Sequence, residues 1–384
     1  MLELFSILQN TVCKNNLDEA KNAISKLDTL SDIYSLADKH DLAHLIGFAL
    51  EKTDLEECEV LEKLRKAKNQ AIFRYLKQES DFEKICNVLE VSQISFIPLK
   101  GLVLREYYPE PWMRTSSDLD ILVHPDKIKM VADILKDELG YISVGKTAHD
   151  MSFYSRNGTH LELHYDTIVS DLNMHAKAIL NNIWIHASNR NDSQYHMRLS
   201  DEMFYFYHMM HMAKHIRNGG CGIRAFLDVW ILNHRICFDK EKRNVLLEKG
   251  GLLTFATSIE RLSEIWFSGE NYDALSKILE EYILRGGTYG VDTNRVVIKQ
   301  GIHRSKTKNI IARIFMPYDS LQLLYPIIQK YRFLTPIFMI VRWLRIIMSG
   351  RIQNANRELC YSLKMSKDQC EFAGQLVEHL GLEE

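Results

Sequence analysis

The chain has 384 residues, more than one average domain requires, and its 46% hydrophobic and 26% charged residues are typical of a globular protein. A formal net charge of −2 excludes a polyelectrolyte-binding surface over the whole chain, so contact with nucleic acid would need a local basic patch. Seven scattered cysteines, none in a Cys-x-x-Cys pair, indicate neither a zinc cluster nor a disulfide framework, and they favour free thiols in the cytoplasm.

The first part of the chain, residues 1–91, is predicted to be helical. Apolar residues recur at helical spacing from Leu17 to Leu89, and no strand-like alternation interrupts them. The first twenty residues lack the basic start and apolar core of a signal peptide. We expect residues 1–91 to form an N-terminal helical region.

The pattern changes at residue 92, and a small α/β unit is predicted over residues 92–170. Ile94–Pro98 is a short β-prone run, and a short helix follows over Leu102–Tyr107. Asp118–Val123 alternates and ends in β-branched residues, which predicts a half-buried strand.

The second half of this unit contains a helix and a hairpin. Pro125 suits the first turn of a helix that runs to about Leu139. Met151–Tyr154 and His160–His164 flank an Arg-Asn-Gly triplet, which predicts two strands joined by an Asn-Gly turn.

The remainder, residues 171–384, is predicted to be a C-terminal helical domain, so the fold class is α+β. Asp201–Ile216 is strongly periodic, and Ile223–His234 follows a glycine-rich break. The most apolar stretch is Phe333–Ile347, which is too short and too charged to span a bilayer. Its few lysines disfavour membrane binding. We therefore expect a core helix or a partner surface. Further helices are expected at 239–249, 253–266, 272–284, 306–315, 318–330, 334–348 and 366–380.

The candidate chemistry begins with Asp118-Leu119-Asp120. Side chains at i and i+2 of a strand point to the same face, so both carboxylates share one face and Leu119 takes the other. Such a pair repels unless a cation lies between its members, and magnesium prefers these oxygen ligands. An isolated Asp-x-Asp is more often a solvated strand end, or a pair bound to Arg105 or Arg114.

Two further motifs favour a metal site over these structural interpretations of Asp-x-Asp. Glu162 lies on the predicted hairpin strand with His160 and His164 on its own face, so it can bring a third carboxylate beside the first two. A glycine at the strand-to-helix turn Lys100-Gly101 lets a ligand approach the backbone, and the lysine adds a positive charge for phosphate.

The run FIPLKGLVLREYYPEPWMRTSSDLDILV (96–123), followed by LGY (139–141) and LELHYD (161–166), resembles an uncharacterised bacterial family of DNA polymerase β-like nucleotidyltransferases. That family has a Leu-Lys-Gly turn, a Tyr-Pro-x-Pro-like loop, an Asp-Leu-Asp strand and a Glu-Leu-His strand. The resemblance continues through residues 208–229, and it extends to 285–290 and 324–347.

The resemblance implies that Asp118, Asp120 and Glu162 are the catalytic, metal-binding carboxylates. They would hold magnesium, as one or two ions, with Mn²⁺ as a substitute. Lys100 and Gly101 stand where the superfamily usually has a Gly-Ser turn that binds triphosphate. The implied fold is a small α/β core flanked by helical domains.

The residues just before the catalytic strand are also implied in nucleotide binding. Arg114 and Ser116 match polar residues of the family that precede this strand, and we expect them to contact phosphate.

Two groups on the later helices have more than one interpretation. His208, His211 and His215 share a helix face, and Lys214 lies nearby. Zinc binding is one interpretation, but contact with nucleotide or packing against the catalytic unit is favoured. His208, His211 and Lys214 are therefore nucleotide-binding candidates. One turn separates Arg224 from Asp228 on the next helix, and the two form either an intrahelical salt bridge or contacts between domains near the site.

The sequence therefore predicts a cytoplasmic, magnesium-dependent nucleotidyltransferase that moves a nucleoside monophosphate from a triphosphate such as ATP to an acceptor hydroxyl and releases pyrophosphate. The acceptor is left open as a small molecule, an RNA end or a protein, and near-neutral charge disfavours a long nucleic acid. One alternative is a catalytically silent protein that binds a nucleotide or a partner for regulation. Another is a helical interaction protein in which Asp-Leu-Asp is accidental.

Overall fold

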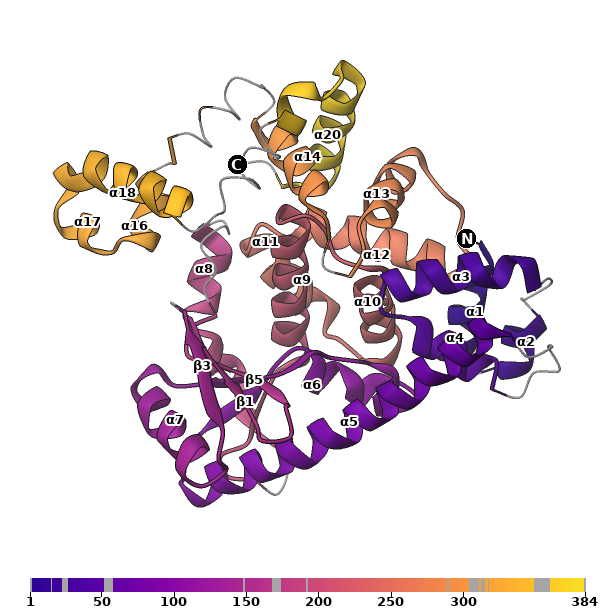
Figure 1. Ribbon diagram of the computed structural model, residues 1–384, viewed down its shortest axis with the longest axis horizontal. Helices are drawn as coiled ribbons and strands as arrows, with labels where there is room; N and C mark the ends of the chain where they lie inside the picture. Colours follow the sequence, from indigo (N-terminus) through magenta and orange to yellow (C-terminus); the bar gives the residue numbers. More distant parts are fainter. Residues whose placement is uncertain are drawn as a thin grey trace.

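The structure is a computed structural model, and helices surround one mixed β-sheet in it, which confirms the α+β class (Figure 1). In the part of the chain that it describes, no helix is long and apolar enough to cross a membrane. The described residues are 2–14, 16–22, 27–51, 58–147, 149–167, 174–190, 193–288, 290–303, 311, 315–316, 318–348 and 360–382.

The N-terminal helices are confirmed, and the longest of them reaches the sheet. Helix α5 runs beneath the strands in Figure 1, with Ile85 and Leu89 buried in the same apolar cluster as the sheet. The first helix lies within the region predicted to be helical, although the periodic pattern was traced only from Leu17. The elements are α1 (Leu2–Leu8), a π-helical turn η1 (Gln9–Cys13), α2 (Leu17–Asn22), α3 (Leu27–Lys39), α4 (Ala43–Ala49) and α5 (Glu59–Val91).

The sheet has five strands in the order β1-β2-β5-β4-β3, and only the β2–β5 pairing is parallel. The predicted hairpin joins β4 and β5: the Ser155 N–H donates to the Thr159 carbonyl, and Gly158 has the positive φ that this turn needs. Strand β3 was not predicted; Ile142 and Val144 alternate along it, but all five of its residues are exposed and none joins the core. The strands are β1 (Phe96–Pro98), β2 (Asp118–Val123), β3 (Ile142–Lys146), β4 (Asp150–Tyr154) and β5 (His160–His164).

Strand β2 is more deeply buried than the sequence predicted, and the prediction of a half-buried strand is wrong. It lies between β1 and β5, so neither edge is free. Leu119, Ile121 and Val123 pack in a cluster with α5 and α7, whereas Leu122 belongs to the larger core on the opposite face. Both faces are covered, and Asp118 and Asp120 lie on the Leu122 side by strand alternation.

Short elements connect the strands to one another and to the later helices. The predicted helix after Lys100 and the predicted helix after Pro125 are both present. A two-stranded sheet of β6 and β7 was not predicted, because three-residue strands are too short to show a periodic pattern. The connecting elements are α6 (Gly101–Leu104), η2 (Arg105–Tyr107), η3 (Pro111–Met113), η4 (Pro125–Lys127), α7 (Ile128–Asp137), α8 (Met174–Leu180), η5 (Ile183–His186), β6 (Ala187–Asn189) and β7 (Met197–Leu199).

The C-terminal part is helical, as predicted, and most boundaries agree within a few residues. The single helix predicted at 318–330 is wrong, because the chain leaves the helix at Tyr325 and Pro326 and forms two short helices there. Ser200 caps α9 through its hydroxyl, which accepts a hydrogen bond from the Met203 N–H. Helix α14 was not predicted, and most of the helix predicted at 306–315 lies outside the described residues. The helices are α9 (Asp201–Arg217), α10 (Ile223–Arg235), α11 (Lys240–Lys249), α12 (Leu253–Ser268), α13 (Ala274–Arg285), α14 (Asp292–His303), α16 (Tyr318–Leu324), α17 (Ile327–Lys330), η6 (Arg332–Leu334), α18 (Thr335–Met348) and α20 (Lys367–His379).

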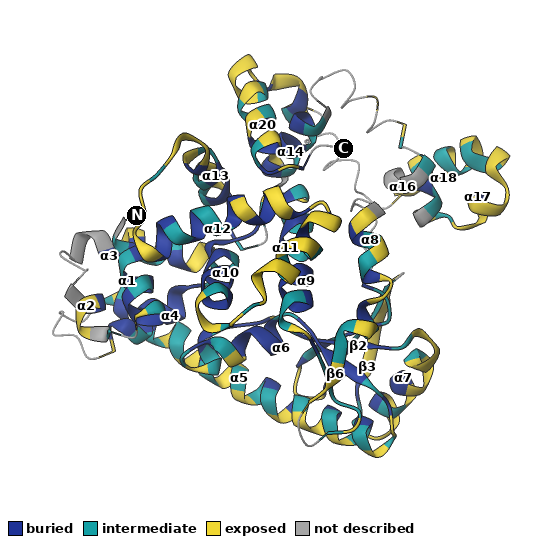
Figure 2. Ribbon diagram, turned by 180° about the vertical axis from the view of Figure 1, so that it is seen from behind, coloured by how far each residue is buried: buried dark blue, intermediate teal, exposed yellow. Residues whose placement is uncertain are grey.

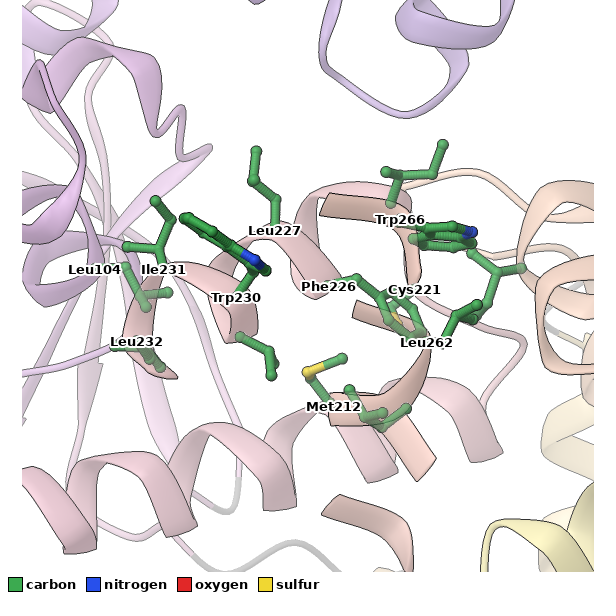
Figure 3. Packing of buried hydrophobic residues seen from close by; sticks show 14 of the residues in the cluster. Leu104, Met212, Cys221, Phe226, Leu227, Trp230, Ile231, Leu232, Leu262 and Trp266 are labelled. Carbon is green, nitrogen blue, oxygen red and sulfur yellow. The ribbon is translucent and has the colours of Figure 1, made fainter. Parts of the chain in front are cut away.

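One large apolar cluster joins the N-terminal helices, α6 and the helices α9, α10 and α12. Figure 3 shows Phe226 and Ile231 of α10 in this cluster, together with Leu104 of α6 and Trp266 of α12. The ring of Phe226 lies 4.8 Å from that of Trp266. The later helices are therefore fixed against the unit that carries the sheet, while the three-part division at 91 and 170 stays a prediction.

Candidate active site

Three carboxylates converge because two adjacent parallel strands carry them in register. Asp120 of β2 pairs with Glu162 of β5, and Asp118 pairs with His160. Alternation along β2 places Asp118 and Asp120 on the same face of the sheet. The side chains form two overlapping groups whose ligand atoms lie within 4.8 Å of one another: Asp118, His160 and Glu162, and Asp120, Glu162 and His164.

The Lys100 ammonium lies between two of these carboxylates. Its Nζ is 2.6 Å from Asp120 Oδ1 and 3.8 Å from Glu162 Oε2. Lys100 also has a φ of 49° and a ψ of −121°, a backbone conformation that residues other than glycine rarely adopt. The turn after β1 thus holds a positive charge at the point where the carboxylates meet. Arg105 and Arg114 were the partners expected if the two aspartates were only structural. Arg105 instead pairs with Glu79, and Arg114 with Asp228.

His164 is a further member of this cluster, and the sequence analysis gave it no role. Its Nε2 is 2.7 Å from Asp120 Oδ1 and 3.5 Å from Glu162 Oε2. It follows Glu162 by two residues on the same strand face, and that spacing was the signal that could have identified it.

The charges within the cluster stabilise one another. Burial opposes ionisation of Asp120, which is only 2% exposed, but Lys100 and His164 outweigh it and hold the pKa of Asp120 below its usual range. The hydrogen bond from His164 lowers the pKa of Glu162. Burial, and then the Asp120 carboxylate, raise the pKa of Asp118. Asp120 is therefore buried on a face of the sheet that the helices α9 and α10 cover.

The loop before β2 closes onto the turn that carries Lys100. A Cβ on Gly101 would lie 2.7 Å from Ser116 Oγ, so only glycine permits this approach. Ser116 Oγ donates to the Asp118 carbonyl over 2.9 Å, and the Ser116 carbonyl accepts from Gln78 Nε2 of α5 over 3.0 Å. Ser116 is therefore held by both β2 and α5.

The cluster forms the floor of a cavity of about 320 Å³, and helices α9 and α10 form its wall. Tyr207 of α9 and Thr288, near the end of α13, also line it, and neither was predicted. Every site residue predicted from the sequence lines this one cavity: Lys100, Gly101, Arg114, Ser116, Asp118, Asp120, Glu162, His208, His211 and Lys214.

The histidines of α9 present neutral side chains to the cavity. Burial lowers the pKa of His208 and of His215 to about 4, and burial together with Lys100 holds the pKa of His211 well below its usual value. The Nε2 atoms of His211 and His215 are 3.2 Å apart. Among the described residues these three histidines do not converge into a three-ligand group, so the zinc interpretation gains no support.

Arg224 and Asp228 of α10 bind other parts of the chain rather than each other. Asp228 Oδ1 accepts from Arg114 Nε over 2.6 Å and from the Tyr108 hydroxyl over 2.7 Å. Arg224 binds Asp41, near the start of α4, and its Nη1 donates to Thr115 Oγ1 over 2.9 Å. The interpretation as an intrahelical salt bridge is therefore wrong, and both residues instead contact other elements beside the cavity. Arg114 is bound to Asp228 at the edge of the cavity.

The donor set fits a divalent cation. Three carboxylates supply the oxygen ligands that magnesium and manganese prefer, and each overlapping group adds one imidazole. Glu162 belongs to both groups, so it could bridge two ions.

Comparison with known proteins agrees with this geometry. A family model described as "Uncharacterised nucleotidyltransferase" matches residues 28–268, more than half of the chain. The chain therefore belongs to this nucleotidyltransferase family. The match begins at α3 and ends with α12, so the similarity noted at 285–290 and 324–347 lies outside it. No curated protein and no solved structure matches the chain.

Proposed function

We propose that this family member transfers a nucleoside monophosphate from a nucleoside triphosphate to an acceptor hydroxyl. The observation that carries the proposal is the convergence of Asp118, Asp120 and Glu162 on two parallel strands at the floor of a cavity. A structural pair of carboxylates would need no third carboxylate beside it and no cavity above it.

Asp118, Asp120 and Glu162 would hold magnesium, or manganese in its place. The bound cation would neutralise phosphate charge and lower the barrier to attack on the α-phosphorus. The acceptor oxygen forms the new bond to the α-phosphorus, the bond from that phosphorus to the bridging oxygen breaks, and pyrophosphate leaves. Glu162 remains ionised because of His164, so it can accept the proton of the attacking hydroxyl.

Lys100 and the loop before β2 would bind the phosphates. Lys100 carries its charge on a turn whose backbone approaches Ser116 closely, and both residues line the cavity. A triphosphate that enters the cavity therefore meets an ammonium group, the Gly101 backbone and a hydroxyl that are already in place. Arg114 is fixed by Asp228 beside this surface and adds a second cation.

The acceptor would approach from the side of α9. His208, His211 and Lys214 line that wall, and the imidazoles are neutral, so they can accept or donate hydrogen bonds without repelling a cation on the floor. This arrangement favours an acceptor whose reacting group is slender enough to enter the cavity, such as a small molecule or the end of a chain.

The test measures thermal unfolding with each of the four ribonucleoside triphosphates, with and without magnesium, for the wild type and for Asp120→Asn. We expect a magnesium-dependent rise in unfolding temperature that disappears in the variant, because a ligand that binds only the folded state stabilises it, by about 2.7 kcal/mol at a hundred times its dissociation constant. Asp126→Asn is the matched control, since Asp126 is exposed in η4 and away from the cavity.

The same preparation is then assayed for pyrophosphate release with candidate acceptors. Release that Asp120→Asn lowers by about 10³-fold supports the proposal, given that loss of one electrostatic contact at a reacting phosphate has effects of this order. A nucleotide that binds with magnesium but is never turned over would favour the silent, regulatory alternative. Equal shifts in the wild type and in Asp120→Asn would contradict the carboxylate site.

A further inference from the structure

The apolar helix α18 exposes its hydrophobic side. Ile337, Ile340, Val341, Leu344 and Met348 are all exposed and lie at positions i, i+3, i+4, i+7 and i+11, so they form one stripe along the helix. From the sequence, a core helix or a partner surface was expected here and membrane binding was disfavoured. For the described part of α18 the core interpretation is wrong, and this exposure reopens the question of membrane binding. We refer to these five residues as the α18 stripe.

The stripe stands on a unit that projects from the rest of the molecule. Helix α16 contacts both α17 and α18, and η6 contacts the latter two. Phe338 of α18 packs its ring 4.9 Å from that of Tyr325. Figure 1 shows this unit beyond the body of the protein, and Figure 2 shows exposed residues over α17 and along α18. The inner side of α18 is thus used for packing on its own unit, while its outer side is left apolar. An exposed apolar stripe of this kind marks an interaction surface.

The charges on the same unit are mostly of one sign. Residues 318–348 contain four basic residues and one acidic residue, in a chain whose net charge is −2. Lys330, Arg332 and Arg345 are exposed. Aromatic residues that suit a membrane interface lie among them: Phe333, which is 76% exposed, and Trp343.

We propose that the α18 stripe and these cations bind the surface of a membrane that contains anionic lipid. The helix has 14 residues, too few to span a bilayer, but an interfacial helix lies in the membrane plane with its apolar face among the acyl chains. Anionic headgroups would neutralise Lys330, Arg332 and Arg345, whereas pairing of the same face with a second copy would bring these cations together. Membrane binding on this surface is independent of the proposed transfer reaction.

The experiment is flotation of the full-length protein with vesicles of phosphatidylcholine alone and with vesicles of equimolar phosphatidylcholine and phosphatidylglycerol. We expect the protein to float with the anionic vesicles, and added salt to weaken this binding. Ile340→Asp together with Leu344→Asp should lower the affinity by about tenfold or more, because two apolar side chains no longer enter the interface.

A matched control keeps the result specific to α18. Phe73 and Leu76 of α5 are 71% and 58% exposed, compared with 62% and 53% for Ile340 and Leu344. Phe73→Asp together with Leu76→Asp removes an equivalent exposed pair from a different helix and should leave flotation unchanged. Lys330→Gln together with Arg345→Gln should weaken binding to anionic vesicles, by about fivefold for each charge removed.

Two outcomes would overturn the proposal. One is a wild-type protein that stays unbound with both kinds of vesicle. The other is a wild-type dimer, seen by analytical ultracentrifugation, that Ile340→Asp with Leu344→Asp converts to a monomer while flotation stays the same in both proteins. That second result would assign the α18 stripe to self-association.

Discussion

The floor and the wall of the cavity differ in the charge of their side chains and in the location of the partners that pair with those charges. On the floor, Asp120, Lys100 and His164 are neighbours whose charges stabilise one another on the strands and the turn of one small unit. On the wall, the histidines of α9 are held neutral by burial, and the charged residues of α10 pair with partners outside their own helix. The floor is therefore ready to hold a cation, whereas the wall is arranged to connect the floor to the rest of the molecule.

The largest effect is expected where wall and floor meet. Asp228→Asn removes the carboxylate from a buried pair and leaves the Arg114 guanidinium without its main compensation, so we expect a loss of roughly 3–5 kcal/mol in the free energy of unfolding. Urea denaturation of the purified variant measures this loss.

Glu106→Gln is the control for that variant. It breaks the Arg190–Glu106 pair, which is exposed on both sides and should contribute less than about 1 kcal/mol. Equal stabilities of the two variants would show that the contact between α10 and the loop before β2 does not hold the cavity together.

A smaller effect tests the neutral wall. Burial lowers the pKa of His208 to about 4, compared with 6.5 for an ordinary histidine, so the unfolded chain takes up the proton first as the pH falls. The stability that depends on neutral His208 is therefore complete above pH 6.5 and is lost as the pH falls to about 4. The loss is on the order of 3 kcal/mol. His208→Asn should flatten this part of the pH profile of unfolding, whereas His175→Asn, at an exposed position on α8, should not. An unchanged profile in His208→Asn would contradict a buried neutral imidazole.

The smallest effect concerns the cation on the floor. Lys100→Met removes the ammonium that lies between Asp120 and Glu162, so the affinity for Mn²⁺ in the absence of nucleotide should rise by about tenfold. Affinity for a triphosphate in the presence of metal should fall in the same variant. Calorimetric titration measures both, and Lys127→Met, which removes an exposed lysine of η4, serves as the control. Weaker Mn²⁺ binding in Lys100→Met would mean that the lysine and the metal do not compete.

The floor could be predicted from the sequence because its signals are local. Asp118 and Asp120 are two residues apart on one strand, and Asn-Gly identified the hairpin that brings Glu162 beside them. Gly101 was identified at a strand-to-helix turn, and the close contact with Ser116 explains why glycine is needed there. Their roles in catalysis remain the proposal made above.

The wall could be predicted only in part. The spacing of the histidines gave their common face, but their burial depends on helices that are distant in the sequence. The sequence left two interpretations of Arg224 open, an intrahelical salt bridge with Asp228 or a contact between domains. The partner in the structure, Asp41, lies 183 residues away. Nothing in the sequence around Arg224 specifies a contact over that distance. Burial of α9 and exposure of α18 likewise depend on tertiary packing, since both helices are rich in apolar residues.

The loop before β2 has consequences for how the chain is made. Thr115 is bound to Asp41, 74 residues earlier, and Arg114 is bound to Asp228, 114 residues later. During synthesis, the ribosome must therefore pass α10 before Arg114 can meet its carboxylate, long after the two strands that carry the carboxylate cluster have been translated. The carboxylates are therefore translated before the helices that complete the cavity. We expect the capacity to bind nucleotide to appear only when most of the protein has emerged from the ribosome.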